Sequence, residues 1–167
     1  MPLRLFVVTG LPGVGKTTVS RALATRVDGR LVRTDTVRAE CLDDPQYTSS
    51  ERATVYDEVF DRARDTLGGG RCVVLDGTFR RRADRKRAVE VAAETGAALG
   101  IVAVECDEST VRRRIAAREN DASDADFAVY RHFRKRYDSV RLPHATIDNS
   151  GTMAATRAQA MALLGDD

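Results

Sequence analysis

The chain has 167 residues, of which 43% are hydrophobic, and a formal net charge of +2. This length allows one domain with a real core and excludes two full ones, so we predict a single domain over residues 1–167. No apolar stretch is long enough to span a bilayer and the first residues lack a signal-peptide pattern, which predicts a cytoplasmic protein without a membrane partner. The odd number and wide spacing of Cys41, Cys72 and Cys106 argue against a disulfide or a zinc site.

Five short segments are expected to be strands. The first of them is mostly apolar and has no helical spacing, as in a strand buried on both faces of a parallel sheet. In chain order the predicted strands are Leu3–Val8, Arg30–Arg33, Arg71–Leu75, Ala97–Val104 and Ala145–Ile147. The second and the fifth are the shortest, and they fit edge positions in a sheet.

Helix-length segments separate these strands. They are Lys16–Val27, Ser50–Leu67, Ala83–Glu94, Glu108–Arg118, Asp124–Tyr137 and Met153–Leu164. In the second of them, apolar residues from Tyr56 to Leu67 recur in steps of three and four, which places them on one helical face. The glycines at 68–70 and Gly96 are helix-stop signals before a strand. This alternation predicts an α/β fold in which a five-stranded parallel sheet carries helices on both faces and binds its ligand at the carboxyl ends of the strands.

The clearest chemical signal is Gly10-Leu11-Pro12-Gly13-Val14-Gly15-Lys16-Thr17, which matches G-x-x-x-x-G-K-[ST] between the first strand and the first helix. In this phosphate-binding loop, or P-loop, backbone N–H groups surround the phosphates, the lysine reaches the terminal phosphates and the hydroxyl binds Mg²⁺. The predicted nucleotide-binding residues are Gly10, Gly13, Val14, Gly15, Lys16, Thr17 and Thr18. We assign Lys16 a catalytic role and Thr17 a metal-binding one.

A P-loop alone does not identify the reaction, because GTPases, transporter ATPases, motors and kinases all carry one. The sequence has no N-K-x-D guanine-reading motif, no transporter signature and no room for a second domain that hydrolysis could drive. By elimination and size, a P-loop NTPase of the kinase type is the leading interpretation.

The second predicted strand is followed by Asp35-Thr36-Val37-Arg38, which places a carboxylate and an arginine one helical turn apart on the same face. Asp35 is a candidate general base for an acceptor hydroxyl, and Arg38 a candidate ligand for the acceptor. The residues themselves leave an alternative open, in which Asp35 caps the next helix and Arg38 is a solvated surface charge.

Five segments together resemble the P-loop kinases that include the kinase domain of phage-type polynucleotide kinase and the AAA_33 group. They are Gly10–Thr17, Asp35–Arg38, Val73–Phe79, Arg114–Arg118 and Ser123–Ala125. The resemblance implies ATP as the phosphoryl donor, Asp35 as the catalytic base and Arg38 as an acceptor ligand. It also implies that Thr78 and Arg85 lie on the acceptor side.

Asp76 ends the third predicted strand, where a carboxylate can hold Mg²⁺ or its water, although a role in the turn before Gly77 is an alternative. The arginine-rich end of the fourth helix and the polar segment after it predict an arginine-bearing lid over about residues 113–126. By resemblance, Arg118 binds phosphate and is catalytic, and Arg114 lies near the adenine. Ion pairing with neighbouring acidic residues is the competing explanation for these arginines.

The acceptor is the least constrained part of the prediction. The same scaffold is similar to zeta toxins, chloramphenicol phosphotransferases and gluconate kinases, and fold does not determine substrate. We predict transfer to a hydroxyl of a small molecule or nucleotide. The alternatives are a polynucleotide 5′-hydroxyl kinase, favoured by basic clusters at 80–87 and 131–136, and a nucleotide-dependent regulatory ATPase. The sequence does not indicate an oligomeric state.

Overall fold

The computed structural model describes residues 2–117 and 123–165, with side chains left out over 123–126. Its five strands are β1 (Arg4–Thr9), β2 (Arg30–Arg33), β3 (Val73–Asp76), β4 (Ala98–Glu105) and β5 (Ala145–Asp148). All four pairings between them are parallel, and the order across the sheet is β2-β3-β1-β4-β5. The predicted five-stranded parallel sheet is therefore confirmed, with β2 and β5 at its edges.

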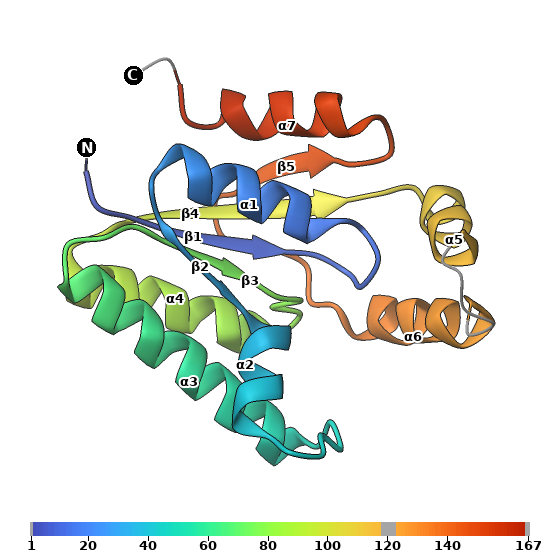
Figure 1. The fold of residues 1–167 in the computed structure, drawn as a ribbon, viewed down its shortest axis with the longest axis horizontal. Helices are drawn as coiled ribbons and strands as arrows, with labels where there is room; N and C mark the ends of the chain where they lie inside the picture. Colours follow the sequence, from blue (N-terminus) through green and yellow to red (C-terminus); the bar gives the residue numbers. More distant parts are fainter. Residues whose placement is uncertain (1, 118–122, 166–167) are drawn as a thin grey trace.

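Seven helices are present in the described parts of the chain (Figure 1). They are α1 (Lys16–Arg26), α2 (Thr34–Cys41), α3 (Ser49–Gly68), α4 (Arg82–Thr95), α5 (Glu108–Ala116), α6 (Ser123–Arg136) and α7 (Met153–Ala162). In Figure 1, α1 and α7 lie on one side of the sheet and α3 and α4 on the other. The helices α5 and α6 lie beyond the carboxyl ends of the strands, at the edge where β1 runs into the P-loop.

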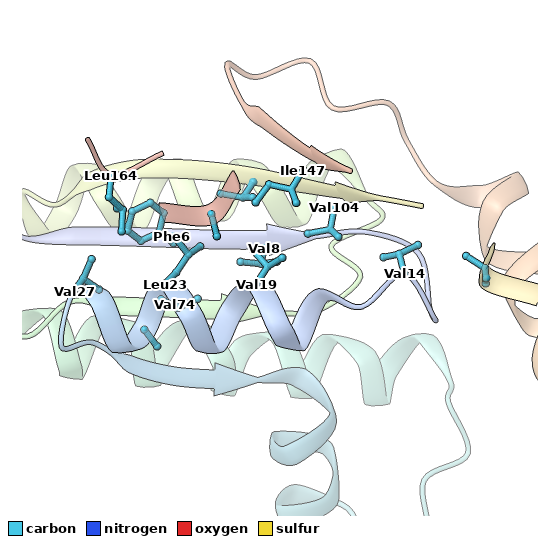
Figure 2. Close-up of a cluster of buried hydrophobic side chains, with 14 of the residues drawn as sticks. Phe6, Val8, Val14, Val19, Leu23, Val27, Val74, Val104, Ile147 and Leu164 are labelled. Atoms are coloured by element: carbon cyan, nitrogen blue, oxygen red, sulfur yellow. The ribbon is translucent and has the colours of Figure 1, made fainter. Parts of the chain in front are cut away.

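Alternating side chains of the strands pack into two separate hydrophobic cores, one on each face of the sheet. Phe6 and Val8 of β1 pack with α1, α5 and α7 in one core, and Leu5 and Val7 of the same strand pack with α3 and α4 in the other. Figure 2 shows the first of these cores, with side chains from β1, β4, β5 and α1 in contact. Because both faces of β1 are buried, its sequence is apolar at nearly every position, which is the pattern expected of a central parallel strand.

Local signals explain where several helices begin and end. Helix α3 begins at Ser49 because Thr48 and Glu51 form a capping box: the Thr48 hydroxyl accepts from the Glu51 N–H (3.2 Å), and the Glu51 carboxylate accepts from the Thr48 N–H (3.3 Å). Helix α4 ends at Gly96, whose φ of 70° lies in the left-handed region that glycine tolerates. The capping box lies at a cavity at the carboxyl edge of the sheet, where Thr48 and Ser49 are lining residues, whereas Gly96 leads into the start of β4 at the opposite edge.

Sequence reasoning placed no separate helix at α2, because eight residues are too few to show a clear apolar period. The helix predicted over Glu108–Arg118 is α5, which ends at Ala116; Arg118 lies outside the described residues. The other predicted elements agree with the structure to within one or two residues at each end. Within the described residues, no helix is long and apolar enough to cross a membrane.

Candidate active site

The P-loop joins β1 to α1 and presents an uncapped helix N-terminus. Gly13 and Gly15 have φ values of 85° and 88°, a conformation that side chains strain to adopt. Gly15 precedes Lys16, the first residue of α1, where no side chain caps the helix and the first turn holds no acidic residue. The free backbone N–H groups and the helix dipole therefore favour an anion at this point.

Asn149, which the sequence did not reveal as a site residue, stabilises the P-loop by a hydrogen bond to its backbone. It follows β5, its side-chain amide donates to the Val14 carbonyl (2.7 Å), and its side-chain oxygen accepts from the buried Thr156 hydroxyl (2.5 Å). A Cβ atom on Gly15 would lie 2.1 Å from the Asn149 amide nitrogen. Gly15 is thus required both for its backbone angle and for the space that Asn149 fills.

Four polar side chains meet where the phosphates of a bound nucleotide would end. The Thr17 hydroxyl donates to the Asp76 carboxylate (3.2 Å), and the Arg33 guanidinium reaches both Thr17 (3.2 Å) and Asp76 (3.6 Å). The Lys16 ammonium donates to the Leu11 carbonyl (3.0 Å). Burial lowers the pKa of Lys16 and raises the pKa of Asp76; their mutual attraction opposes both shifts. Arg33 was not predicted from the sequence, because the strand-end position alone did not distinguish it from many surface arginines.

A cavity of about 1140 Å³ opens at the carboxyl edge of the sheet and joins this cluster to α2, α3 and α6. The sequence-predicted site residues that line it are Gly13, Gly15, Lys16, Thr17, Asp35, Arg38, Asp76, Thr78 and Arg114. Gly10, Val14 and Thr18 lie in or next to the loop but do not line the cavity. Arg118 lies outside the described residues.

On the far side of the cavity, Asp35 and Arg38 extend from α2. The Arg38 guanidinium donates to the Asp35 carboxylate (3.3 Å) and lies over the Tyr47 ring (5.2 Å). The Asp35 side chain is 79% exposed, whereas that of Asp76 is only 6% exposed. Asp35 also acts electrostatically on Lys16, so the carboxylate and the P-loop lysine face a common space. The geometry therefore favours a place at the site over the alternative that Asp35 only caps α2.

The sequence model of the AAA_33 family, described as an AAA domain, matches residues 5–140. The chain belongs to the AAA_33 family. An uncharacterized protein of Mycobacterium tuberculosis is 34% identical to this AAA_33 chain over 135 residues, a match that covers 74% of the chain and 27% of that relative. The chain thus spans about a quarter of the length of the curated relatives that it matches.

Two solved structures are similar to this AAA_33 protein over nearly all of its length. The APS kinase of Mycobacterium tuberculosis in complex with AMPPNP and APS has a TM-score of 0.77 at 17% identity, covering 99% of this chain and 100% of that one. A gluconokinase from Sinorhizobium meliloti has a TM-score of 0.74 at 19% identity, covering 96% and 90%. At these identities the likeness concerns the fold alone, and it confirms the predicted α/β fold of a P-loop NTPase.

The oxygen atoms of Thr17 and Asp76 fit a magnesium ion that arrives with a nucleotide. Mg²⁺ prefers hard oxygen ligands and commonly takes only one or two from the protein, with phosphate and water completing the shell. The hydroxyl and the carboxylate lie 3.2 Å apart at the P-loop, so both can face one ion or its water. Among the residues that the structure describes, no group of three or more His, Cys, Asp or Glu side chains is placed to hold a metal ion.

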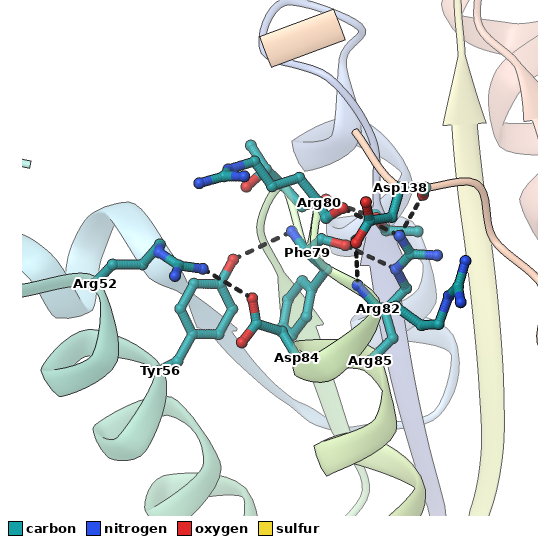
Figure 3. Close-up of polar contacts among 10 residues, drawn as sticks. Arg52, Tyr56, Phe79, Arg80, Arg82, Asp84, Arg85 and Asp138 are labelled. Carbon is teal, nitrogen blue, oxygen red and sulfur yellow. Dashed lines mark hydrogen bonds and ion pairs between the residues drawn. The ribbon is translucent and has the colours of Figure 1, made fainter. Parts of the chain in front are cut away.

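Arg85, predicted to bind the substrate, does not reach the cavity. It is 1% exposed, and its guanidinium donates to the carbonyls of Phe79 (2.9 Å), Arg80 (3.2 Å), Asp138 and Ser139 (3.1 Å). Figure 3 shows these bonds converging from α4. The prediction is wrong for a physical reason: the arginine is buried, and four of its five N–H groups already donate to carbonyls of the loop after β3 and of the chain after α6.

Arg114 and helix α6 contribute to the cavity in a way that only partly follows the sequence. Arg114 donates to the Gly151 carbonyl (3.2 Å) beyond β5, away from the acceptor side. The lid was predicted over about residues 113–126, and most of it lies outside the residues whose side chains the structure describes. The described residues of α6 that line the cavity are Ala128, Val129, His132, Phe133 and Arg136. The periodicity of α6 alone did not show which face would meet a ligand.

Proposed function

We propose that this AAA_33 protein is an ATP-dependent phosphotransferase that moves the γ-phosphoryl group to a hydroxyl of a small molecule or nucleotide. One observation carries the proposal: a single cavity holds the P-loop at one end and the exposed carboxylate of Asp35 at the other. Phosphoryl transfer requires a donor and an acceptor in one water-shielded space, with a proton acceptor beside the attacking oxygen. The APS kinase of similar fold was solved with AMPPNP and APS bound, which supports a donor and an acceptor on this scaffold.

On the donor side, each residue has a distinct role in this proposal. The backbone N–H groups of the P-loop and the Lys16 ammonium bind the phosphates, and Thr17 and Asp76 hold Mg²⁺. Magnesium neutralises charge on the β- and γ-phosphates. Arg114 lines the cavity and donates to the Gly151 carbonyl, and in this proposal it contacts the nucleoside part of ATP.

On the acceptor side, the hydroxyl oxygen attacks the γ-phosphorus. A new oxygen–phosphorus bond forms, the bond from the γ-phosphorus to the β–γ bridging oxygen breaks, and ADP leaves with that electron pair. The hydroxyl proton passes to the Asp35 carboxylate, which is accessible and held in place by Arg38. Arg38 keeps further N–H donors for the acceptor.

The distribution of charge favours a small acceptor over a polynucleotide end. Half of the arginines in the two basic clusters are already engaged, four of eight: Arg87 pairs with Asp57 (2.8 Å), Arg131 and Arg134 pair with Glu108, and the fourth is Arg85. Arg85 is buried against carbonyls. A strand-binding surface needs a continuous basic stripe for successive phosphates, and these pairs interrupt it.

The test is transfer of radiolabel from [γ-³²P]ATP with Mg²⁺. Separate reactions contain nucleosides and nucleotides, sugars and sugar acids, aminoglycosides, and DNA or RNA with 5′-hydroxyl ends. We expect label in a small molecule. Label confined to an oligonucleotide would replace the small acceptor by a nucleic-acid end, and release of free phosphate without any labelled acceptor would favour the regulatory ATPase.

A further inference from the structure

Away from the P-loop, the cavity is lined by more arginines than carboxylates. Apart from Arg33 and Arg114, four arginines line it, namely Arg38, Arg52, Arg80 and Arg136, and among the described residues Asp35 is the one carboxylate that lines it besides Asp76. Among the residues whose side chains the structure describes, Arg80 and Arg136 have no carboxylate partner within 4 Å. Arg38 and Arg52 each have one carboxylate partner, so the four guanidinium groups together keep an excess of positive charge that a neutral acceptor would leave unbalanced.

Arg38 and Arg52 are each oriented by a contact with a carboxylate. Arg38 is oriented by Asp35 (3.3 Å) and by the Tyr47 ring (5.2 Å). Arg52, on α3, donates to the buried Asp84 of α4 at 3.3 Å, as Figure 3 shows. Each contact uses one N–H group of a five-donor guanidinium, so the remaining donors can address a ligand. The parallel N–H groups of a guanidinium can donate to two oxygen atoms at once, so an oriented arginine binds a carboxylate or phosphate better than a single hydroxyl.

An apolar wall completes this part of the cavity. Tyr47 is 75% exposed and Val129 is 46% exposed, and both line the cavity, which is an unusual place for large apolar side chains to meet water. Tyr47 also has a φ of 55°, a strained value for a residue other than glycine. The strain is consistent with a loop built to present this ring beside Arg38.

We infer that the acceptor is a small compound with an oxyanion group, a phosphate or a carboxylate, that Arg38 and Arg52 bind while its hydroxyl lies at Asp35. The carbon skeleton then packs against Tyr47 and Val129. This inference rests on the proposed function for the hydroxyl, but the oxyanion site can be tested without turnover.

The binding test uses inorganic phosphate on protein saturated with Mg·AMPPNP, so that the P-loop is already filled. Ionic strength is kept constant with chloride, and binding is followed by the shift of the thermal unfolding midpoint with phosphate concentration. We expect saturable stabilisation by phosphate that weakens about tenfold or more in Arg38→Ala and in Arg52→Lys. Arg52→Lys keeps a cation beside the buried Asp84, so a loss of phosphate binding in this variant would not be due to a loss of stability.

Arg64→Ala is the matched control, because it removes an arginine from the same helix α3 that pairs instead with Glu94 (2.8 Å) outside the cavity. Its phosphate titration should equal that of the unaltered protein. A stabilisation that chloride reproduces, or one that Arg38→Ala and Arg52→Lys leave unchanged, would overturn the oxyanion site.

The turnover test compares matched acceptors that differ only in the oxyanion, namely a neutral hydroxyl compound, its phosphate monoester and its carboxylate. Preferential labelling of the phosphate ester or of the carboxylate supports the inference and identifies which group is bound. Efficient labelling of the neutral compound alone would overturn it while upholding the phosphotransferase. No labelling of any compound, with phosphate binding intact, would remove the proposed reaction and leave the oxyanion site in place.

Discussion

Asp35 and Asp76 line the same cavity, but the two carboxylates differ in burial and therefore suit different chemical roles. Asp76 ends a central strand, has Thr17, Arg33 and Lys16 as neighbours, and is almost fully shielded from water. Asp35 stands at the start of α2, is largely exposed, and has Arg38 as its one ion-pair partner among the described residues. A shielded carboxylate among cations suits a metal ion, and an accessible one suits proton transfer.

Replacing Asp35 by asparagine tests the base directly. Asparagine keeps the size of the side chain and can still accept from Arg38, but it cannot take a proton. We expect phosphoryl transfer to fall by about 10²–10⁴-fold, with ATP affinity unchanged. The measurements are the single-turnover rate and the dissociation constant of ATP. Transfer at the normal rate would show that another group, or none, accepts the proton.

The pH dependence of metal binding follows from Asp76. Burial raises the pKa of this carboxyl above 3.8, and Lys16, Arg33 and Thr17 oppose only part of the shift. The ionised form holds the metal, and it is lost as pH falls through the raised pKa. We therefore expect kcat/KM for Mg·ATP to decline at a higher pH than an ordinary aspartate would give.

The control for this profile is nucleotide binding in EDTA over the same pH range, with circular dichroism to confirm that the protein stays folded. Without metal the decline should be absent, because Asp76 then has no ion to bind. An acid decline of equal size in EDTA would assign it to a different group.

At the scale of elements, the site depends on contacts between segments far apart in the chain. Asn149 follows β5 and supports the P-loop after β1, and Arg85 of α4 connects the loop after β3 to the chain after α6. The Thr9 hydroxyl at the end of β1 likewise donates to the Thr78 carbonyl (2.6 Å). These links hold the donor and acceptor sides of the cavity in one geometry.

Asn149→Ala should weaken ATP binding by about tenfold, because the Val14 carbonyl and the Thr156 hydroxyl both lose a partner next to the P-loop. Asn149→Asp should cause a similar loss, since it can accept from Thr156 but cannot donate to Val14. Thr146→Ala, at an exposed position on the strand β5 that precedes Asn149, is the control. Calorimetric titration with ATP measures all three. Unchanged affinity in both Asn149 variants would show that the loop keeps its shape without this support.

Arg85→Met separates a structural role from substrate binding. It leaves several carbonyls without donors, so we expect the free energy of unfolding to fall by on the order of 3 kcal/mol in urea denaturation. Lys86→Met, the exposed neighbour on α4, should change it little. A rise in the acceptor KM at unchanged stability would instead restore the substrate-binding role that the sequence suggested.

The sequence predicted those features that depend on local pattern. The strands of the sheet and the P-loop follow from apolar runs and from glycine spacing, and the Asp35–Arg38 pair follows from helical geometry. Arg33, Arg52 and Asn149 could not be found in this way, because their roles arise from segments that meet only in the fold. Arg85 was misassigned for the same reason: a basic cluster in sequence does not show which of its members points into the core.

For the whole molecule, the net charge of +2 conceals a strong asymmetry. Among the side chains that the structure describes, seven cations and two carboxylates, Asp35 and Asp76, line the cavity; the cations are Lys16, Arg33, Arg38, Arg52, Arg80, Arg114 and Arg136. The rest of the protein is therefore net negative. Such a distribution attracts anionic ligands to the cavity. Because the folded protein binds them and the unfolded chain does not, these ligands should stabilise the fold.

Binding of Mg·ATP should raise the thermal unfolding midpoint by about 5–10 °C at one hundred times its dissociation constant. The ligand fills a cavity lined by residues of β2, β3, α1, α2, α3, α5 and α6, so unfolding must release it. Lys16→Ala should abolish most of the shift, because it removes the ammonium that meets the terminal phosphates. Arg64→Ala should preserve it. Scanning calorimetry with and without Mg·ATP measures the shift in the unfolding midpoint. An equal shift in Lys16→Ala would show that the nucleotide binds elsewhere, because nucleotide bound at the P-loop must contact this lysine.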